Sequence, residues 1–130
     1  MVQQPKLLIV DDEERFCKTM VKLLKVEGIV VKAVGSGEDA LVELSENAYD
    51  VVLLDVKMPG ISGIETLKRI KAQGCDAEVI VLTGHASMDI ALNCIDYGAY
   101  DYLLKPCDVE EINLKISQAY ECKLEKEKIG

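Results

Sequence analysis

The segment Val51-Val52-Leu53-Leu54-Asp55-Val56-Lys57-Met58-Pro59-Gly60 decides the fold. Its four leading apolar residues, two of them β-branched, predict a strand that is buried on both faces, as in a parallel sheet covered by helices. Met-Pro-Gly ends this strand, because proline has no N–H for a strand ladder and glycine permits a sharp turn. Because an isolated charge is costly to bury, we expect Asp55 at the rim of the sheet beside a cation.

The composition predicts one globular domain. The chain has 130 residues, of which 49% are hydrophobic and 29% charged, enough for a single core. No apolar run approaches the ~20 residues that cross a bilayer, and no leader-like segment opens the chain, so we expect a cytoplasmic protein without a membrane partner. The net charge of −8 argues against nucleic-acid binding, which needs a local excess of Lys and Arg.

The cysteines predict neither a zinc site nor a disulfide framework. They are odd in number and no two of them have the C-x-x-C spacing. We expect free, reduced thiols packed as small apolar groups. The five are Cys17, Cys75, Cys94, Cys107 and Cys122.

Strand-like and helix-like segments alternate along the chain. Short apolar runs predict strands at residues 6–10, 29–34, 51–54, 78–82 and 100–104. Amphipathic segments predict helices at residues 13–26, after Ser36, at 62–74, at about 87–97 and from Asp108 to about Lys128, with Ser36, Ser62 and Asp108 as N-caps. Because parallel strands are joined by right-handed crossovers, this order predicts a doubly wound α/β fold with five parallel strands and five helices.

Charged or hydroxyl-bearing residues end four of the predicted strands. They are Asp11 and Asp12, then Asp55, then Thr83, then Lys105. Parallel sheets bind their ligands outside the carboxyl ends of the strands, so we expect these side chains at one edge. Three neighbouring carboxylates repel one another and must therefore hold protons or bind a cation. Oxygen ligands without His or Cys favour Mg²⁺ or Mn²⁺.

Such a site is suited to a phosphoryl group. A divalent metal ion and the ammonium of Lys105 would neutralise the phosphoryl oxygens, and the hydroxyl of Thr83 can donate to a third oxygen. Asp55 is then free to attack phosphorus and form an acyl phosphate. The strand ends therefore predict phosphoryl transfer to Asp55.

These motifs at these spacings resemble the receiver domain of bacterial two-component response regulators, the CheY-like domains, over residues ~5 to ~120. The runs 54–60 and 81–85 are similar to receivers of sigma-54-dependent activators in particular. The resemblance implies a flavodoxin-like sheet with the strand order 2-1-3-4-5. It implies a receiver domain over residues 1–122, with residues 123–130 as a helical extension or the start of a linker.

The resemblance also implies roles for the strand-end residues. Asp55 would accept a phosphoryl group from a sensor histidine kinase or a phosphotransfer protein, and Lys105 would pair with that group. Asp11, Asp12, Asp55 and the backbone carbonyl of Lys57 would hold Mg²⁺, with Mn²⁺ as a substitute. The Lys105–Pro106 peptide bond would be cis, which only an X-Pro bond adopts readily.

A conformational switch is part of the same resemblance. Phosphate on Asp55 would draw the hydroxyl of Thr83 inward and favour an inward rotamer of Tyr102. The surface of the fourth helix, the last strand and the last helix would change as a population shift. That surface would control an output domain or partner protein, or form a homodimer.

Several residues have two readings each. Lys57 is either a solvated loop residue or a side chain that leans toward the phosphate and alters its lifetime. His85 is either an exposed loop residue or a modulator of water access. Tyr102 is either a switch or core filling, and residues 121–128 either fray or begin a linker helix or dimer arm.

Three rival functions fit the sequence less well. A phosphatase of the haloacid dehalogenase type places a second Asp two residues after its nucleophile, where this chain has Lys57. A flavodoxin would meet four acids at residues 11–14 where its FMN phosphate binds. A receiver-like binding module without phosphorylation needs none of the site groups that are present. We therefore expect no enzyme beyond self-phosphorylation from small donors and autodephosphorylation.

Overall fold

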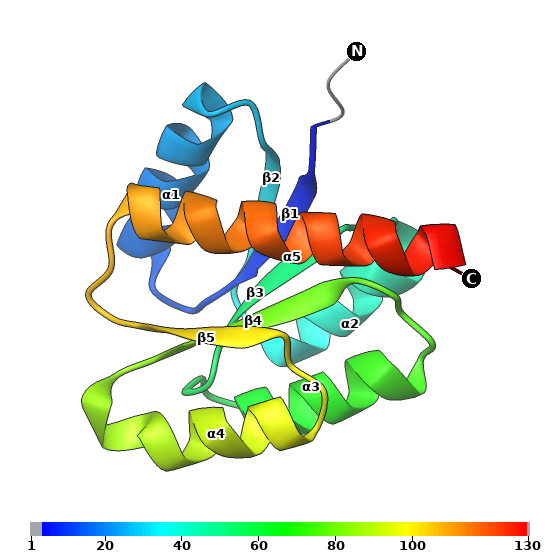
Figure 1. Cartoon of the computed structure of the whole chain (residues 1–130). Helices are drawn as coiled ribbons and strands as arrows, with labels where there is room; N and C mark the ends of the chain where they lie inside the picture. The colour runs from blue at the N-terminus through cyan, green and yellow to red at the C-terminus, as the bar shows by residue number, and fades with distance from the viewer. Residues whose placement is uncertain (1–3, 130) are drawn as a thin grey trace.

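The five predicted strands form one parallel sheet. The computed structural model describes residues 4–129, and its strand order is β2-β1-β3-β4-β5, which confirms the predicted fold (Figure 1). The strands are β1 (Lys6–Val10), β2 (Val30–Val34), β3 (Val51–Asp55), β4 (Glu78–Thr83) and β5 (Asp101–Leu104). β3 lies at the centre and all five of its residues are buried, as its continuous apolar run predicts.

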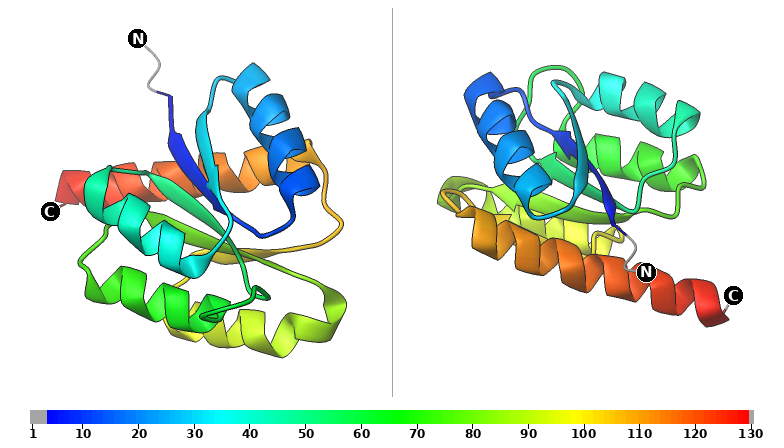
Figure 2. Two further views of the ribbon diagram at one scale, coloured as in Figure 1. Left: turned by 180° about the vertical axis from the view of Figure 1, so that it is seen from behind. Right: turned by 90° about the horizontal axis from the view of Figure 1, so that it is seen from above.

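Helices cover both faces of the sheet. They are α1 (Glu14–Val26), α2 (Gly37–Glu46), α3 (Gly63–Ala72), α4 (Met88–Asp96) and α5 (Val109–Ile129), and a single 3₁₀ turn, His85–Ser87, precedes α4. Side chains of α1 and α5 form one core with the sheet, and side chains of α2, α3 and α4 form a second core on the opposite face (Figure 2).

The predicted N-caps are formed. The side chain of Ser36 accepts a hydrogen bond from the N–H of Asp39 at 3.0 Å, and that of Ser62 accepts one from the N–H of Glu65 at 3.2 Å. The carboxylate of Asp108 caps α5 through the N–H of Glu111 at 2.9 Å. These bonds satisfy N–H groups that have no partner within the helix.

Two glycines shape the turn after β3. Gly60 has a φ of +84°, a conformation that other residues adopt only with strain. Gly63 opens α3 so close to the strand that an added Cβ would lie 2.5 Å from the Cα of Val56. The loop that follows Asp55 is therefore held tightly against the end of β3.

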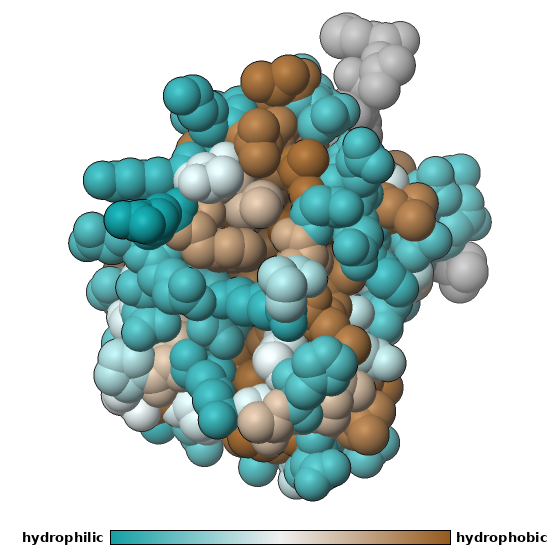
Figure 3. All heavy atoms as spheres, turned by 90° about the vertical axis from the view of Figure 1, so that its left-hand side faces the viewer, coloured by the Kyte–Doolittle hydropathy of each residue, from teal (hydrophilic) through white to brown (hydrophobic). Residues whose placement is uncertain are grey.

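Hydrophobic side chains are exposed beside the end of α1. Figure 3 shows the left-hand side of Figure 1, where hydrophilic side chains cover much of the face and hydrophobic ones gather in its upper half. Leu23 and Val26 of α1 and Val30 of β2 are among the large hydrophobic residues that are exposed.

All five cysteines are free thiols, as predicted. Among the residues that the structure covers, no helix combines the length and hydrophobicity that a membrane span needs.

The last turns of α5 are tied to the sheet. Nζ of Lys123 lies 3.2 Å from a carboxylate oxygen of Asp50, and Nζ of Lys126 lies 2.7 Å from one of Glu78. Asp50 precedes β3 and Glu78 begins β4, so the tail of α5 contacts the amino ends of the two central strands. The predicted domain boundary between residues 122 and 123 stays a prediction, and residues 1–3 and 130 lie outside the described residues.

Lys126→Met is expected to lower the free energy of unfolding by about 1–3 kcal/mol, because it leaves a buried carboxylate without its cation. The side chain of Glu78 is only 6% exposed. Urea denaturation at pH 7.5 measures the loss. Lys128→Met is the matched control, since the pair of Lys128 with Glu125 is exposed on both sides at 3.5 Å and contributes little. Equal losses in the two variants would contradict a structural role for the Lys126 pair.

Candidate functional site

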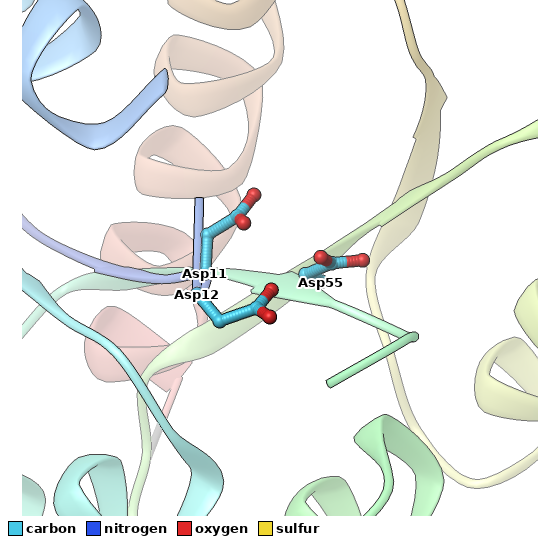
Figure 4. Close-up of side chains that lie close together, drawn as sticks. All are labelled: Asp11, Asp12 and Asp55. Atoms are coloured by element: carbon cyan, nitrogen blue, oxygen red, sulfur yellow. The ribbon is translucent and has the colours of Figure 1, made fainter. Parts of the chain in front are cut away.

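Three carboxylates meet at the carboxyl edge of the sheet. Asp11 and Asp12 follow β1 and Asp55 ends β3; the two strands are neighbours, with Val10 beside Leu54. One oxygen from each acid lies within 4.8 Å of the others, and Figure 4 shows the three side chains close together beyond the strand ends. Asp11 and Asp55 are buried whereas Asp12 is exposed. The predicted convergence of these acids is what the structure shows.

Lys105 supplies the cation beside this cluster. It follows β5, and its Nζ lies 2.7 Å from Oδ2 of Asp11 and 3.8 Å from Oδ2 of Asp55. The Lys105–Pro106 peptide bond is cis, as the resemblance implied. The ammonium therefore contacts Asp11, the buried acid that follows β1, and lies within Coulombic reach of Asp55.

The site raises the proton affinity of Asp55. Burial lifts the pKa of its carboxyl from 3.8 to about 6, and the negative charges of Asp11 and Asp12 add to this, while the N–H of Lys57 and the charge of Lys105 oppose it. The N–H of Lys57 donates to Oδ1 of Asp55 at 3.1 Å. Asp55 is therefore a carboxylate with little solvation, which favours attack on an electrophile once it is ionised.

Hydrogen bonds keep the lysine charged. Burial by itself would lower the pKa of Lys105, but hydrogen bonds to Asp11 and Glu13 and the charge of Asp55 raise it overall. A permanently protonated ammonium can stabilise a dianionic group, but it does not act as a proton donor at neutral pH.

Thr83 lies on β4, the strand next to Asp55, and Tyr102 lies on β5, the edge strand beyond it. Thr83 ends β4, one residue beyond Leu82, which pairs with Asp55, and its buried hydroxyl donates to the carbonyl of Gly84 at 3.0 Å. Tyr102 of β5 pairs with Val81 and is partly buried against the second core. The hydroxyl of Thr83 is thus placed at the same strand edge as the acids, with a neutral partner that it can exchange.

The side chains of Lys57 and His85 are exposed. Lys57 follows β3 by two residues and His85 begins the 3₁₀ turn after β4. Both loops flank Asp55, and the special roles of these two side chains stay predictions.

Three residues to which the sequence assigns no role in the site contact Lys105 or Asp11. Oε1 of Glu13 lies 2.9 Å from Nζ of Lys105, and the ring of Phe16 lies 4.5 Å from the same atom. Cys17 donates to the carbonyl of Asp11 at 3.3 Å. The sequence predicts Glu13 and Phe16 only as part of the helix at residues 13–26, although an acid directly after an Asp-Asp pair is a signal for Glu13. Burial raises the pKa of Cys17 to about 11, so its thiol stays neutral.

The site opens to solvent beside α1. An open groove of about 530 Å³ has Asp11, Asp12, Cys17 and Gly35 among its lining residues. The carboxylate oxygens of Asp11 and Asp12 in its wall fit a hard cation. The ammonium of Lys105, which contacts Asp11, fits an anion. The geometry therefore supports binding a divalent cation together with a phosphoryl group at Asp55.

Comparison with known proteins gives one consistent family. The family profile described as "Response regulator receiver domain" matches residues 7–117. The chain is 37% identical to the transcriptional regulatory protein ZraR of Klebsiella oxytoca over 117 residues, which is 90% of this chain and 26% of that protein. It is 42% identical over 113 residues to a cyclic di-GMP phosphodiesterase of Thermotoga maritima, covering 87% of this chain and 30% of that protein.

A solved structure agrees with these matches. The crystal structure of a response regulator receiver domain protein from Clostridium thermocellum superposes with a TM-score of 0.87 at 35% identity and covers 92% of this chain and 96% of that one. The chain thus spans between a quarter and a third of the two curated relatives and nearly all of this solved domain. The phosphodiesterase name describes a protein of which this chain resembles only a minor part.

Proposed function

This chain belongs to the response regulator receiver domain family, and on that basis we propose that Asp55 is the residue that accepts the phosphoryl group. Members of this family are signalling modules of two-component systems that act as switches by accepting a phosphoryl group. The observation that carries the assignment is the position of Asp55 at the end of the central strand, within the acid cluster and 3.8 Å from Nζ of Lys105. Asp11 of the same cluster is already hydrogen-bonded to Lys105 at 2.7 Å, whereas Asp55 is not.

Asp11, Asp12, Asp55 and the backbone carbonyl of Lys57 are the proposed ligands of Mg²⁺, with Mn²⁺ as a substitute. The fit rests on the donor set, since the three acids offer oxygen atoms within 4.8 Å of one another and hard divalent ions select oxygen ligands. When bound, the ion would neutralise charge on the phosphoryl oxygens.

The proposed step is a displacement at phosphorus. An oxygen of Asp55 attacks the phosphorus atom of a phosphohistidine, or of a small acyl phosphate, and the bond from phosphorus to the donor breaks as the donor leaves with the electron pair. Lys105 is placed to pair with a phosphoryl oxygen, and its positive charge offsets the charge that develops there.

The switch is proposed to follow from the new phosphoryl group. The Thr83 hydroxyl would exchange the Gly84 carbonyl for a phosphoryl oxygen, and Tyr102 would take the space beside it. The surface formed by α4, β5 and α5 would then change its preference between partners. Lys57 and His85, which flank the site, would modulate the lifetime of the phosphate.

The proposed partners come from the family. A sensor histidine kinase or phosphotransfer protein would supply the phosphoryl group, and an output domain or a separate partner protein would respond to it. A homodimer through α4, β5 and α5 is a further proposal, as is a cytoplasmic location.

Incubating the chain with acetyl phosphate and MgCl₂ is expected to add the mass of one phosphoryl group, and Asp55→Ala is expected to abolish the gain because the nucleophile is gone. Intact-mass spectrometry measures both. Asp96→Asn, at an exposed acid that ends α4, should gain the same mass as the wild type.

The same experiment tests the rival functions. A wild type that gains no mass would leave a protein-binding module that is not phosphorylated. Rapid multiple-turnover release of inorganic phosphate would point instead to a phosphatase. A mass gain that persists in Asp55→Ala would show that the phosphoacceptor has been wrongly assigned.

A further inference from the structure

Three acids share the ammonium of Lys105. Its Nζ lies 2.7 Å from Asp11, 2.9 Å from Glu13 and 3.8 Å from Asp55. Only the first two distances are hydrogen bonds. An ammonium has three N–H donors, so in this state two of them are directed away from the proposed phosphoacceptor.

The two hydrogen-bonded acids differ in how easily they can release the lysine. The side chain of Asp11 is fully buried, whereas that of Glu13 is 63% exposed. Separating Lys105 from Asp11 would leave a buried charge without a partner, which is strongly unfavourable. Water can solvate Glu13, so its bond to Lys105 is the one that can be exchanged at little cost.

We propose that Glu13 is a positioning residue that holds Lys105 away from Asp55 and thereby restrains phosphorylation, an inference that rests on the proposed function. Pairing with a phosphoryl group on Asp55 requires the ammonium to move closer to a residue that it now approaches only to 3.8 Å. Every contact with Glu13 competes with that movement. The ring of Phe16, 4.5 Å from Nζ, adds a cation–π contact with the same ammonium.

Glu13→Gln in the whole chain is expected to raise the second-order rate constant for phosphorylation by acetyl phosphate about two- to fivefold, the effect of one exposed ion pair. Intact-mass spectrometry follows the reaction at constant ionic strength and saturating MgCl₂, so that a change in metal affinity does not contribute.

Glu14→Gln is the matched control. Glu14 is the next residue, is also exposed and lines the groove beside the acids. Glu14→Gln removes one negative charge, as Glu13→Gln does. Its rate therefore shows how much the loss of any nearby negative charge speeds phosphorylation by an anionic donor such as acetyl phosphate. The proposal requires a clearly larger gain in Glu13→Gln, and equal gains would overturn it.

A double-mutant cycle with Lys105→Ala separates a positioning role from a general field effect. If Glu13 acts through Lys105, the gain from Glu13→Gln falls to that of Glu14→Gln when Lys105 is absent. A gain that persists in full would overturn the inference, as would an unchanged or lower rate in Glu13→Gln alone. Absence of any phosphoryl gain on the wild type would overturn the proposed function itself, which keeps the two failures distinct.

Discussion

Lys105→Ala is expected to slow phosphoryl transfer to Asp55 at least about 100-fold. A charge that is already in place where negative charge develops contributes about two to three orders of magnitude to a rate. Nζ of Lys105 is only 3.8 Å from Asp55 and its side chain is 20% exposed, so bulk water does not screen it fully. The measurement is the rate of mass gain with acetyl phosphate and saturating MgCl₂.

Lys32→Ala is the control for this loss of charge. Lys32 of β2 forms an ion pair with Glu43 of α2 at 2.9 Å, and Glu43 is not an acid of the site. The phosphorylation rate of Lys32→Ala should stay within about twofold of the wild-type rate, because the ion-pair partner of Lys32 lies outside the site. A Lys105→Ala rate within tenfold of the wild type would show that the ammonium does not stabilise the transferring group.

Asp55→Asn is expected to raise the free energy of unfolding by about 1–3 kcal/mol at pH 7.5 without Mg²⁺. The pKa of Asp55 rises from 3.8 to about 6 in the folded chain, so the folded state binds more protons than the unfolded state between these values. Stability of the wild type therefore falls as the pH rises from about 4 to about 6, by about 1.4 kcal/mol per pKa unit. The amide of Asn carries no charge, so its burial at this position has no such pH-dependent cost.

Urea denaturation at pH 4.5 and pH 7.5 tests the sign. The advantage of Asp55→Asn should be smaller at pH 4.5, where both side chains are largely neutral. Added MgCl₂ should reduce the stability difference between Asp55→Asn and the wild type at pH 7.5. A ligand that binds the folded state stabilises it, and Mg²⁺ should stabilise the wild type more than the variant. Asp96→Asn should change stability by less than about 0.5 kcal/mol at either pH, and a pH-independent advantage would contradict the burial of a charged Asp55.

The sequence by itself determined the sheet and the acids at its edge. Each strand is a short apolar run, and parallel strands carry their following residues to one edge, so the sequence predicts Asp55 and Lys105 at the same edge of the sheet. The N-cap at Ser36 is likewise a local feature, because its partner is three residues away. Such properties follow from spacing along the chain.

Only the tertiary structure decided what Lys105 and the tail of α5 contact. Glu13 and Lys105 are 92 residues apart, and Glu78 and Lys126 are 48 apart, so no local pattern links them. The raised pKa of Asp55 also depends on burial by surrounding elements. These features arise from how helices and loops pack onto the sheet. That packing brings side chains distant in sequence into ion pairs or into one low-dielectric site, and the periodicity of the sequence carries no information about it.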